Sequence, residues 1–418
     1  MKVLESRKAA KIIAQLAGRG AVNLAKAEPV ARKIIAEVRR KGDAALRKYG
    51  EQWDGLHKYQ PLAASVDEMQ AALQGISPKL REALQQAAEN IRRFCEWQSP
   101  AEWSKQQQPG VTVGQIIRPL DSVGCYVPGG RHPLPSTMLM TVIPAQVAGV
   151  KRIAVVSPKP APETLATAAL LGIGEFYRIG GAQAVAALAY GTRTVRPVAK
   201  IVGPGNSFVT AAKKLVSFDC SIDMLAGPTE VAIVSDNGDP GFIASDLVAQ
   251  SEHDPETLAV FITSNAKLAK AVANEAKRQA KENAIAKRSL AQNAVALVTD
   301  SKEESFAIAN AIAPEHISID SAEDLVHITA AGSVFVGPWS AQSVGDYASG
   351  PNHTLPTGAA ARFRGGLSIL DYVKHITVQE LSREGLEQIA GCVTTLAAAE
   401  GLNAHAQAVT IRLNSQLR

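Results

Sequence analysis

The sequence predicts an α/β protein made of two consecutive blocks, each with a parallel sheet covered by helices. Two observations carry this prediction. Short apolar runs of strand length alternate with helical apolar patterns between residues 123 and 234, and a second series of the same kind follows from residue 240. With 418 residues, the chain is also too long for a single hydrophobic core. We therefore expect two similar domains with a cleft between them.

The first block starts with two strands and then alternates regularly. Val111–Ile117 has the alternation of a strand, which Pro119 ends, and Val123–Val127 forms the next strand before the tight turn Pro128-Gly129-Gly130. Further strands are expected at Arg152–Val156, Phe176–Ile179, Ala199–Val202 and Glu230–Val234. The helices between them are expected at Glu163–Leu171, Ala182–Ala189 and Ser207–Val216.

The second block repeats the pattern. Its strands are expected at Leu258–Ile262, Ala294–Val298, Ile317–Ile319 and Ser333–Val336, and its helices at Pro240–His253, Ala266–Glu282 and Glu303–Ile312. Residues before 110 are expected to be mostly helical, with apolar helical patterns at Val30–Tyr49 and Leu80–Trp97. After about residue 370 the pattern is interpreted as helical to the end, and Ile376–Leu402 is expected to be an arm that reaches a neighbouring chain.

Composition excludes several classes of protein. The chain is 46% hydrophobic and 20% charged, and its net charge of +5 is dispersed and too small to indicate nucleic-acid binding. The basic stretch Lys267–Arg288 has the spacing of a solvated helix face. No two of Cys95, Cys125, Cys220 and Cys392 form a close pair, which favours a reducing compartment. Without a signal-type segment or a membrane-length apolar run, we expect a cytoplasmic protein.

The end of the helix predicted after Pro240 carries an amide and an imidazole. Gln250 and His253 lie three positions apart, so they share one helix face, and Pro255 stops the helix soon afterwards. Two such side chains could form half of a metal site. Taken alone, the pair is better explained as a hydrogen-bonded polar helix end.

Two later stretches could supply partners. Gly345 to His353 contains two glycines and a proline and is predicted to be a loop, in which Asp346 is either a hard-oxygen metal ligand or a residue that braces a turn. Glu315 and His316 lie at the start of a predicted strand, where a twisted strand end can present both to a cleft. An adjacent acid and imidazole suit proton transfer, although a surface turn is the alternative.

A third stretch lies near the C-terminus. Gly401 fits a helix C-terminus and Asn403 fits the N-cap of the next helix, so Glu400 ends one helix and His405 opens another. A break between helices is a good place for two polar groups to meet a ligand. Taken alone, it is better explained as a structural corner.

A glycine-rich stretch, Gly203-Pro204-Gly205-Asn206-Ser207, follows a predicted strand and precedes a helix. Bare backbone N–H groups at a helix start favour phosphate or another anion. The stretch is not the dinucleotide fingerprint Gly-x-Gly-x-x-Gly, because Phe208 occupies the last position. It is therefore a weak indication of a cofactor by itself.

Eight stretches together resemble the histidinol dehydrogenase family, in the family's order from about residue 20 to the end. They are Gly124 to Gly130, Gly180 to Ala184, Gly203 to Asn206, Ala226 to Glu230, Gln250 to His253, Pro314 to His316, Gly345 to His353, and Glu400 to His405. The resemblance implies a zinc- and NAD-dependent enzyme that oxidises L-histidinol to L-histidine in the final step of histidine biosynthesis. It also implies a homodimer with exchanged tails, and no nucleic-acid or membrane partner.

The resemblance assigns roles to residues of this sequence. It implies that Gln250, His253, Asp346 and His405 bind one Zn²⁺ per subunit and lie against the substrate. It implies that Tyr126, Gln183 and Asn206 contact NAD, and that Thr229, His316, His353, Glu400 and also Ser136 contact the substrate. Glu315 and His316 match the catalytic pair. The resemblance leaves open which chain supplies Glu400 and His405.

The resemblance also implies a division into domains. A helical N-terminal segment would cover residues 1–19, and a first Rossmann-like domain would combine 20–125 with 234–370. A second Rossmann-like, NAD-binding domain would cover 126–233, and a C-terminal helical arm exchanged in the dimer would cover 371–418.

The implied mechanism is a four-electron oxidation through histidinaldehyde. His316 would accept the alcohol proton as hydride leaves to NAD, and Glu315 would then activate water to hydrate the aldehyde before a second hydride transfer. Cys125 is the rival nucleophile, although an apolar strand buries cysteines readily and no base lies near it in the sequence. His57, His327 and His375 match no site and are interpreted as surface or packing residues.

The sequence departs from the family's pattern at two places, and two alternative functions are open. Thr229 stands where many relatives have serine, which keeps the hydroxyl, whereas Arg131–Pro135 differs from the relatives and could signal another substrate. One alternative is a related zinc and NAD dehydrogenase for another small polyol, such as a sulfonated diol. Glu400 and His353 argue against it, because a carboxylate repels a sulfonate. The other alternative is a metal-binding homologue without turnover, which the intact pair Glu315 and His316 argues against.

Overall fold

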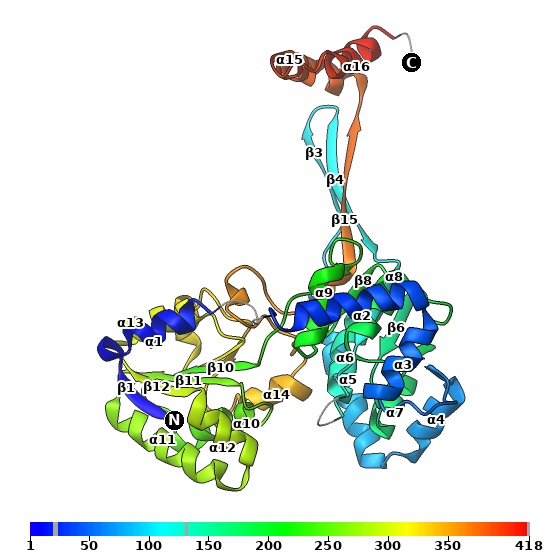
Figure 1. Cartoon of the computed structure of the whole chain (residues 1–418). Helices are drawn as coiled ribbons and strands as arrows, with labels where there is room; N and C mark the ends of the chain where they lie inside the picture. The colour runs from blue at the N-terminus through cyan, green and yellow to red at the C-terminus, as the bar shows by residue number, and fades with distance from the viewer. Residues whose placement is uncertain (20–23, 130–132, 416–418) are drawn as a thin grey trace. The chain divides into compact units, whose positions relative to one another are not determined.

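The structure is a computed structural model that describes residues 1–19, 24–129 and 133–415. The chain forms two compact units, labelled by element in Figure 1. The first unit comprises Met1–Gln98 and Leu120–Tyr372, and the second comprises Ser99–Pro119 and Val373–Arg418. No helix in the described ranges is both long enough and apolar enough to cross a membrane.

The first unit contains a six-stranded sheet in which all neighbouring strands are parallel. Its strand order is β1 (Lys2–Glu5), β12 (Ala294–Val298), β11 (Leu258–Thr263), β10 (Glu230–Val234), β13 (His316–Ile319) and β14 (Ser333–Val336). One face packs against α10 (Pro240–Ser251), α11 (Ala266–Gln279) and α12 (Ala284–Gln292), and the other against α1 (Ala10–Ala17) and α13 (Lys302–Ile312). Strands covered on both faces explain the nearly continuous apolar runs in the sequence.

A second six-stranded sheet in the same unit has the order β2 (Ala63–Ala64), β7 (Glu175–Tyr177), β6 (Arg152–Val156), β5 (Ser122–Tyr126), β8 (Lys200–Val202) and β9 (Ser221–Ile222). All pairs are parallel except β2 with β7. The strand order reverses at β5, which lies between β6 and β8. In open α/β sheets such a reversal marks the crevice where ligands bind.

Eight helices cover this second sheet. One face packs against α2 (Ala27–Lys41), α3 (Asp43–Trp53), α8 (Gly181–Tyr190) and α9 (Ser207–Val216). The other packs against α4 (Val66–Gly75), α5 (Pro78–Trp97), α6 (Pro135–Val147) and α7 (Pro162–Leu170). The predicted α/β class with two parallel-sheet cores is thus confirmed.

The second unit is an antiparallel sheet followed by two helices. Its strand order is β15 (Val373–Leu381), β4 (Val111–Pro119) and β3 (Trp103–Gln108), and α15 (Arg383–Ala399) and α16 (Asn403–Leu413) follow β15. The prediction of helix after about residue 370 is wrong over β15. That segment is rich in β-branched residues, which favour strands, and β4 gives it a partner along its whole length.

The structure divides the chain differently from the expected domain boundaries. The helices and strands between residues 27 and 97, together with β5, pack with the second sheet, not with the first sheet, which contains β10 to β14. Residues 99–119 belong to the second unit. The N-terminal segment 1–19 is only partly helical, because β1 pairs with β12 at the edge of the first sheet. Local sequence patterns do not predict pairings between segments that lie far apart in the chain.

Gly203 shows why the loop after β8 needs glycine. Its φ is 108°, and an added Cβ would lie 2.2 Å from the carbonyl oxygen of Tyr126. We expect Gly203→Ala to lower the free energy of unfolding, measured by urea titration, by about 2 kcal/mol or more, since a strained backbone alone costs about 1–3 kcal/mol.

Gly174→Ala is the matched control for this prediction. Gly174 is exposed and an added Cβ would meet nothing within 4 Å. Its free energy of unfolding should stay within about 0.5 kcal/mol of the wild type. A similar loss of stability in both variants would contradict the prediction.

Candidate active site

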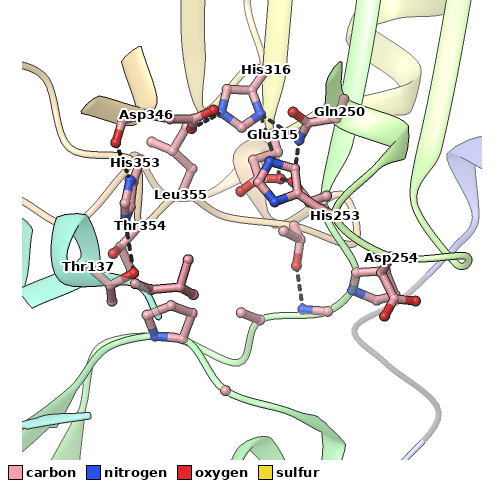
Figure 2. Close-up of a pocket in the computed structure, with 18 of the residues that line it drawn as sticks. Thr137, Gln250, His253, Asp254, Glu315, His316, Asp346, His353, Thr354 and Leu355 are labelled. Carbon is pink, nitrogen blue, oxygen red and sulfur yellow. Dashed lines mark hydrogen bonds and ion pairs between the residues drawn. The ribbon is translucent and has the colours of Figure 1, made fainter. Parts of the chain in front are cut away.

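One cavity of about 460 Å³ in the first unit is lined by residues attached to both of its sheets. On the first sheet, these residues lie at the starts of β10 and β13, and on the second sheet they follow β8. Figure 2 shows the polar side chains that converge there. The lining includes Ser136, Thr137, Asn206, Thr229, Gln250, His253, Glu315, His316, Asp346 and His353, nearly all of which were proposed from the sequence.

A chain of hydrogen bonds runs from Gln250 to the buried carboxyl of Glu315. The Gln250 amide Nε2 donates to Thr229 Oγ1, and that hydroxyl donates in turn to Glu315 Oε2. The backbone N–H of Glu230 donates to the same oxygen at 2.9 Å. The Thr229 hydroxyl therefore donates a hydrogen bond to the carboxyl and accepts one from the amide.

Burial dominates the electrostatics of Glu315. The side chain is almost completely buried, and this loss of solvent raises the pKa of the carboxyl well above its usual value. The hydrogen bonds from Thr229 and Glu230 lower the pKa again, but by less than burial raises it. A carboxyl with a raised pKa is a stronger base when it is ionised.

His316 lies beside Glu315 and is itself buried (Figure 2). Its Nδ1 is 3.6 Å from Glu315 Oε2 and 3.1 Å from the carbonyl oxygen of Glu230, and its Nε2 is 3.9 Å from Asp346 Oδ1. Burial lowers the pKa of the imidazole, and the neighbouring Asp346 carboxylate opposes this shift. The predicted strand start at this position is confirmed, since β13 begins at His316.

Asp346 and His353 occupy another side of the cavity. His353 Nδ1 lies 2.8 Å from the Asp346 carbonyl oxygen and its Nε2 lies 3.3 Å from Thr137 Oγ1, a contact that the sequence did not suggest. The prediction of a loop is wrong at Asp346, which belongs to the short helix α14 (Gln342–Tyr347). Gly345 is needed there for packing, because an added Cβ would lie 2.7 Å from the Phe335 ring.

Gln250 and His253 both line the cavity, but they do not share one helix face as the sequence predicted. Helix α10 ends at Ser251, so Gln250 is buried in its last turn and His253 is exposed beyond it. The Oε1 atom of Gln250 is buried and accepts no hydrogen bond from the part of the chain that the structure describes. This unpaired amide oxygen, on a residue that lines the same cavity as His253 and Asp346, can bind a metal ion or accept a hydrogen bond from a ligand.

The donor set for a metal is nevertheless incomplete within this cavity. Across residues 1–19, 24–129 and 133–415, no group of three His, Cys, Asp or Glu side chains could hold a metal ion. The amide of Gln250 therefore has to contribute if these residues bind one. Glu400 and His405 belong to the second unit, where both are exposed at the junction of α15 and α16.

A second cavity, of about 590 Å³, adjoins the loop after β8. Tyr126, Gln183 and Asn206 all line it, and it shares Gly205 and Asn206 with the first cavity. Asn206 caps α9 through its side-chain oxygen, which accepts from the N–H groups of Phe208 and Val209 at 3.0 and 3.1 Å. The side-chain amide N–H₂ of Asn206 is then the part available to a ligand.

A buried ion pair fixes the loop that the two cavities share. Lys213 on α9 pairs with Asp223, and both side chains are almost fully buried. Asp223 Oδ2 accepts the Gly203 N–H at 2.7 Å, and Lys213 Nζ donates to the Gly203 carbonyl at 3.0 Å. Sequence reasoning missed this pair, because nothing local marks two charges as buried partners.

Cys125 is poorly placed to act as a nucleophile. It is fully buried in β5, and burial raises the pKa of its thiol to about 12. The reactive thiolate is therefore scarce at neutral pH. The segment Arg131–Pro135, which departs from the family's pattern, lies partly outside the described residues.

Comparisons with known proteins agree over almost the whole chain. A family model described as histidinol dehydrogenase matches residues 18–413. The histidinol dehydrogenase of Methanothermobacter thermautotrophicus is 46% identical over 398 residues, which cover 92% of this chain and 93% of that protein. The enzyme of Vibrio parahaemolyticus is 44% identical over 392 residues, which cover 91% of this chain and 90% of that protein.

A solved structure agrees as well. The crystal structure of histidinol dehydrogenase from Elizabethkingia anophelis superposes with a TM-score of 0.93 at 35% identity, covering 99% of this chain and 98% of that one. Fold, cavities and relatives together define an α/β oxidoreductase of the dehydrogenase class. More particularly, the chain belongs to the histidinol dehydrogenase family.

The hydrogen bond from Thr229 gives a testable pH dependence. Thr229→Val keeps the shape but removes the donor that lowers the pKa of Glu315, so that pKa should rise further. If ionised Glu315 is the base, the acid limb of the pH–rate profile should move up by about one unit, since a hydrogen bond to a charged group contributes about 1.5–3 kcal/mol.

Thr229→Ser keeps the hydroxyl and serves as the control. Its pH–rate profile should match that of the wild type. An acid limb that stays in place in Thr229→Val would show that the Glu315 carboxyl does not set it.

Proposed function

We propose that the protein oxidises L-histidinol to L-histidine, with NAD as electron acceptor, as the final step of histidine biosynthesis. The observation that carries the proposal is the buried pair Glu315 and His316, which share one cavity with Gln250, His253 and Asp346. Family membership supports the choice of substrate, because relatives that share 44% and 46% identity carry the name histidinol dehydrogenase.

His316 is proposed to take the alcohol proton at Nε2. The Glu230 carbonyl, 3.1 Å from Nδ1, can only accept, so Nδ1 carries the hydrogen and Nε2 keeps its lone pair. The lowered pKa keeps the ring neutral near pH 7, which is the form that can accept a proton.

Glu315 is proposed to act in the second oxidation, as the base that removes a proton from a water molecule attacking the aldehyde carbon. Thr229 and Glu230 hold its Oε2 in place, so the orientation of the carboxyl is fixed. The raised pKa strengthens the base, and the water-poor surroundings strengthen every electrostatic contact. The resulting hydrate loses a hydride, for which a second NAD would be the acceptor, and two protons, and so becomes the carboxylate.

Gln250, His253, Asp346 and His405 are proposed to hold one zinc ion per subunit. The free, buried Oε1 of Gln250 fits this role, and a mixed set of imidazole nitrogens and oxygens suits zinc. Bound zinc would supply a Lewis acid that fixes the imidazole and amine of the substrate.

The cofactor is proposed to occupy the second cavity, in contact with Tyr126, Gln183 and Asn206. These three residues line that cavity, and Asn206 also lines the first one. NAD would supply the hydride acceptor. A loop common to both cavities supports a path by which the nicotinamide reaches the substrate.

The second unit is proposed to be exchanged between the subunits of a homodimer. Its helices leave apolar side chains exposed, among them Leu396, Leu402 and Ile411. Glu400 and His405 would then complete a substrate and zinc site. The cytoplasmic location expected from the sequence stays a prediction.

The first test is NADH formation from L-histidinol by the purified, zinc-loaded protein. We expect two NADH for each histidinol, because alcohol and aldehyde are oxidised in turn. His316→Ala should lower turnover about 10²–10⁴-fold, the usual contribution of a general base. His327→Ala, which changes an exposed histidine stacked on Phe306, should keep wild-type turnover.

Three outcomes would contradict the proposed reaction. One NADH per histidinol would refute the second oxidation. NADH from a sulfonated diol but none from histidinol would indicate the related polyol dehydrogenase. No NADH from either would support a metal-binding protein without turnover.

The proposed zinc ligands and the proposed exchange of the second unit between subunits can be tested together. Zinc content measured on purified protein should be one per subunit, and Gln250→Ala, His253→Ala and His405→Ala should each lower it without unfolding the protein. If each active site takes His405 from the other subunit, mixing inactive His316→Ala and His405→Ala proteins produces hybrid dimers with one intact site. About a quarter of the wild-type activity should return after subunits reassort.

The control for this experiment mixes His316→Ala with Glu315→Ala. Both changes lie at the same cavity of the first unit, so no hybrid should regain activity. Full zinc content in His405→Ala would exclude that residue as a ligand. Recovery in neither mixture would show that each chain supplies its own residues.

A further inference from the structure

The second cavity extends away from the shared loop along the carboxyl ends of the second sheet. Its lining includes Pro128 after β5 and Pro158 and Lys159 after β6, besides Gly205 and Asn206 after β8. These are the strands at which the order of the sheet reverses. If the nicotinamide lies at Asn206, the other end of the dinucleotide extends toward the end of β6.

Two aromatic side chains make that cavity suitable for an adenine ring. Trp53 and Phe208 both line it, and they are 46% and 41% exposed although both are large and apolar. Trp53 is held in place by stacking on Tyr49, with ring centroids 4.9 Å apart. Exposed aromatic faces next to a cavity offer stacking surfaces for a base.

The positive charge in the loop after β6, taken alone, would favour NADP over NAD. In Rossmann folds, an acidic residue after the second strand of the sheet binds the ribose hydroxyls of NAD, whereas a basic residue suits the 2′-phosphate of NADP. Here the loop after β6 carries Lys159, three residues beyond Val156, the last residue of the strand. Lys159 is exposed, and its aliphatic stem lies over Gly55, where an added Cβ would be 2.8 Å from Lys159 Cε.

Asp54 supplies a carboxyl to the same cavity from outside the sheet. It caps the end of α3, lines the cavity and is 6% exposed. Its Oδ2 accepts the Gly180 N–H at 2.9 Å and the Gln183 Nε2 at 3.0 Å, which fixes its position. Asp54 and Lys159 are the sole charged side chains among the described lining residues, so the cavity has no surplus positive charge.

We propose that Asp54 makes this site select NAD over NADP, by accepting hydrogen bonds from the adenosine ribose hydroxyls and repelling a 2′-phosphate. A fixed, buried carboxylate acts at low local dielectric, where repulsion of a phosphate is strong. The exposed ammonium group of Lys159 is screened by water and offset by Asp54, so it cannot compensate. The inference rests on the proposed use of a nicotinamide cofactor.

The test compares kcat/KM for NAD and NADP in the wild type and in Asp54→Asn, with saturating histidinol. The asparagine keeps an oxygen that can accept from Gly180, so the fold should survive. We expect a wild-type preference for NAD of at least 100-fold, and a ratio at least tenfold smaller in Asp54→Asn. The change should appear in KM, with kcat for saturating NAD within about threefold.

Glu51→Gln is the matched control, because Glu51 is exposed on the same helix and does not line the cavity. This variant should keep the wild-type ratio of kcat/KM for NAD to kcat/KM for NADP. A ratio in Asp54→Asn within twofold of the wild type would overturn the proposal, as would a wild type that uses both cofactors equally.

Binding without substrate separates this inference from the proposed function. The dissociation constants of NAD and NADP are measured by calorimetry on the wild type, Asp54→Asn and Asp54→Ser. Selective binding of NAD that weakens in both variants supports the role of Asp54 even if histidinol is not oxidised. Histidinol oxidation with unchanged selectivity in both variants supports the function and overturns the role of Asp54. Binding of neither nucleotide overturns both.

Discussion

Glu230, the first residue of β10, holds Glu315 and His316, the pair proposed to be catalytic, in place through its backbone, and its own side chain is anchored by two partners. Its N–H binds the Glu315 carboxyl and its carbonyl lies against His316 Nδ1. The buried Glu230 carboxylate is bound twice by Arg19, at 2.8 and 2.5 Å, and once by the Gly358 N–H at 2.9 Å. Breaking a buried pair of this kind leaves an uncompensated charge, so the geometry of the site depends on it.

Local patterns sufficed for the elements whose own residues show a clear apolar period and end at turn residues. The strands β6, β10, β12 and β14 and the helix α9 have the bounds that periodicity and turn residues predicted. Helix α6 was not predicted because every residue from Ser136 to Ala145 is buried, so it lacks a polar face and the period that reveals a helix. The expected helix Val30–Tyr49 is two helices, because Gly42 adopts a φ of 53°.

For the site, the sequence indicated which residue types carry chemistry but not how they meet. The eight stretches that resemble the family brought the Glu315–His316 pair and Gln250 into one hypothesis, and the structure places all three at one cavity. Thr137 and Asp54 could not be found in this way, since each acts through a contact made across a large distance along the chain. Such contacts depend on tertiary packing, which a single sequence does not reveal.

The two cavities are built on opposite kinds of sheet edge. Thr229, Glu315 and His316 lie at the starts of β10 and β13 on one sheet. The second cavity is lined by residues that follow β5, β6 and β8 on the other sheet, among them Pro128, Lys159 and Asn206. The two cavities share the loop at Gly205 and Asn206 and the start of α9, where Ser207 lines the first cavity and Phe208 the second. Away from this shared loop and helix start, the residues proposed to choose the nucleotide and the residues proposed for proton transfer lie on different sheets. Substitutions in one set can therefore be made without altering a side chain of the other.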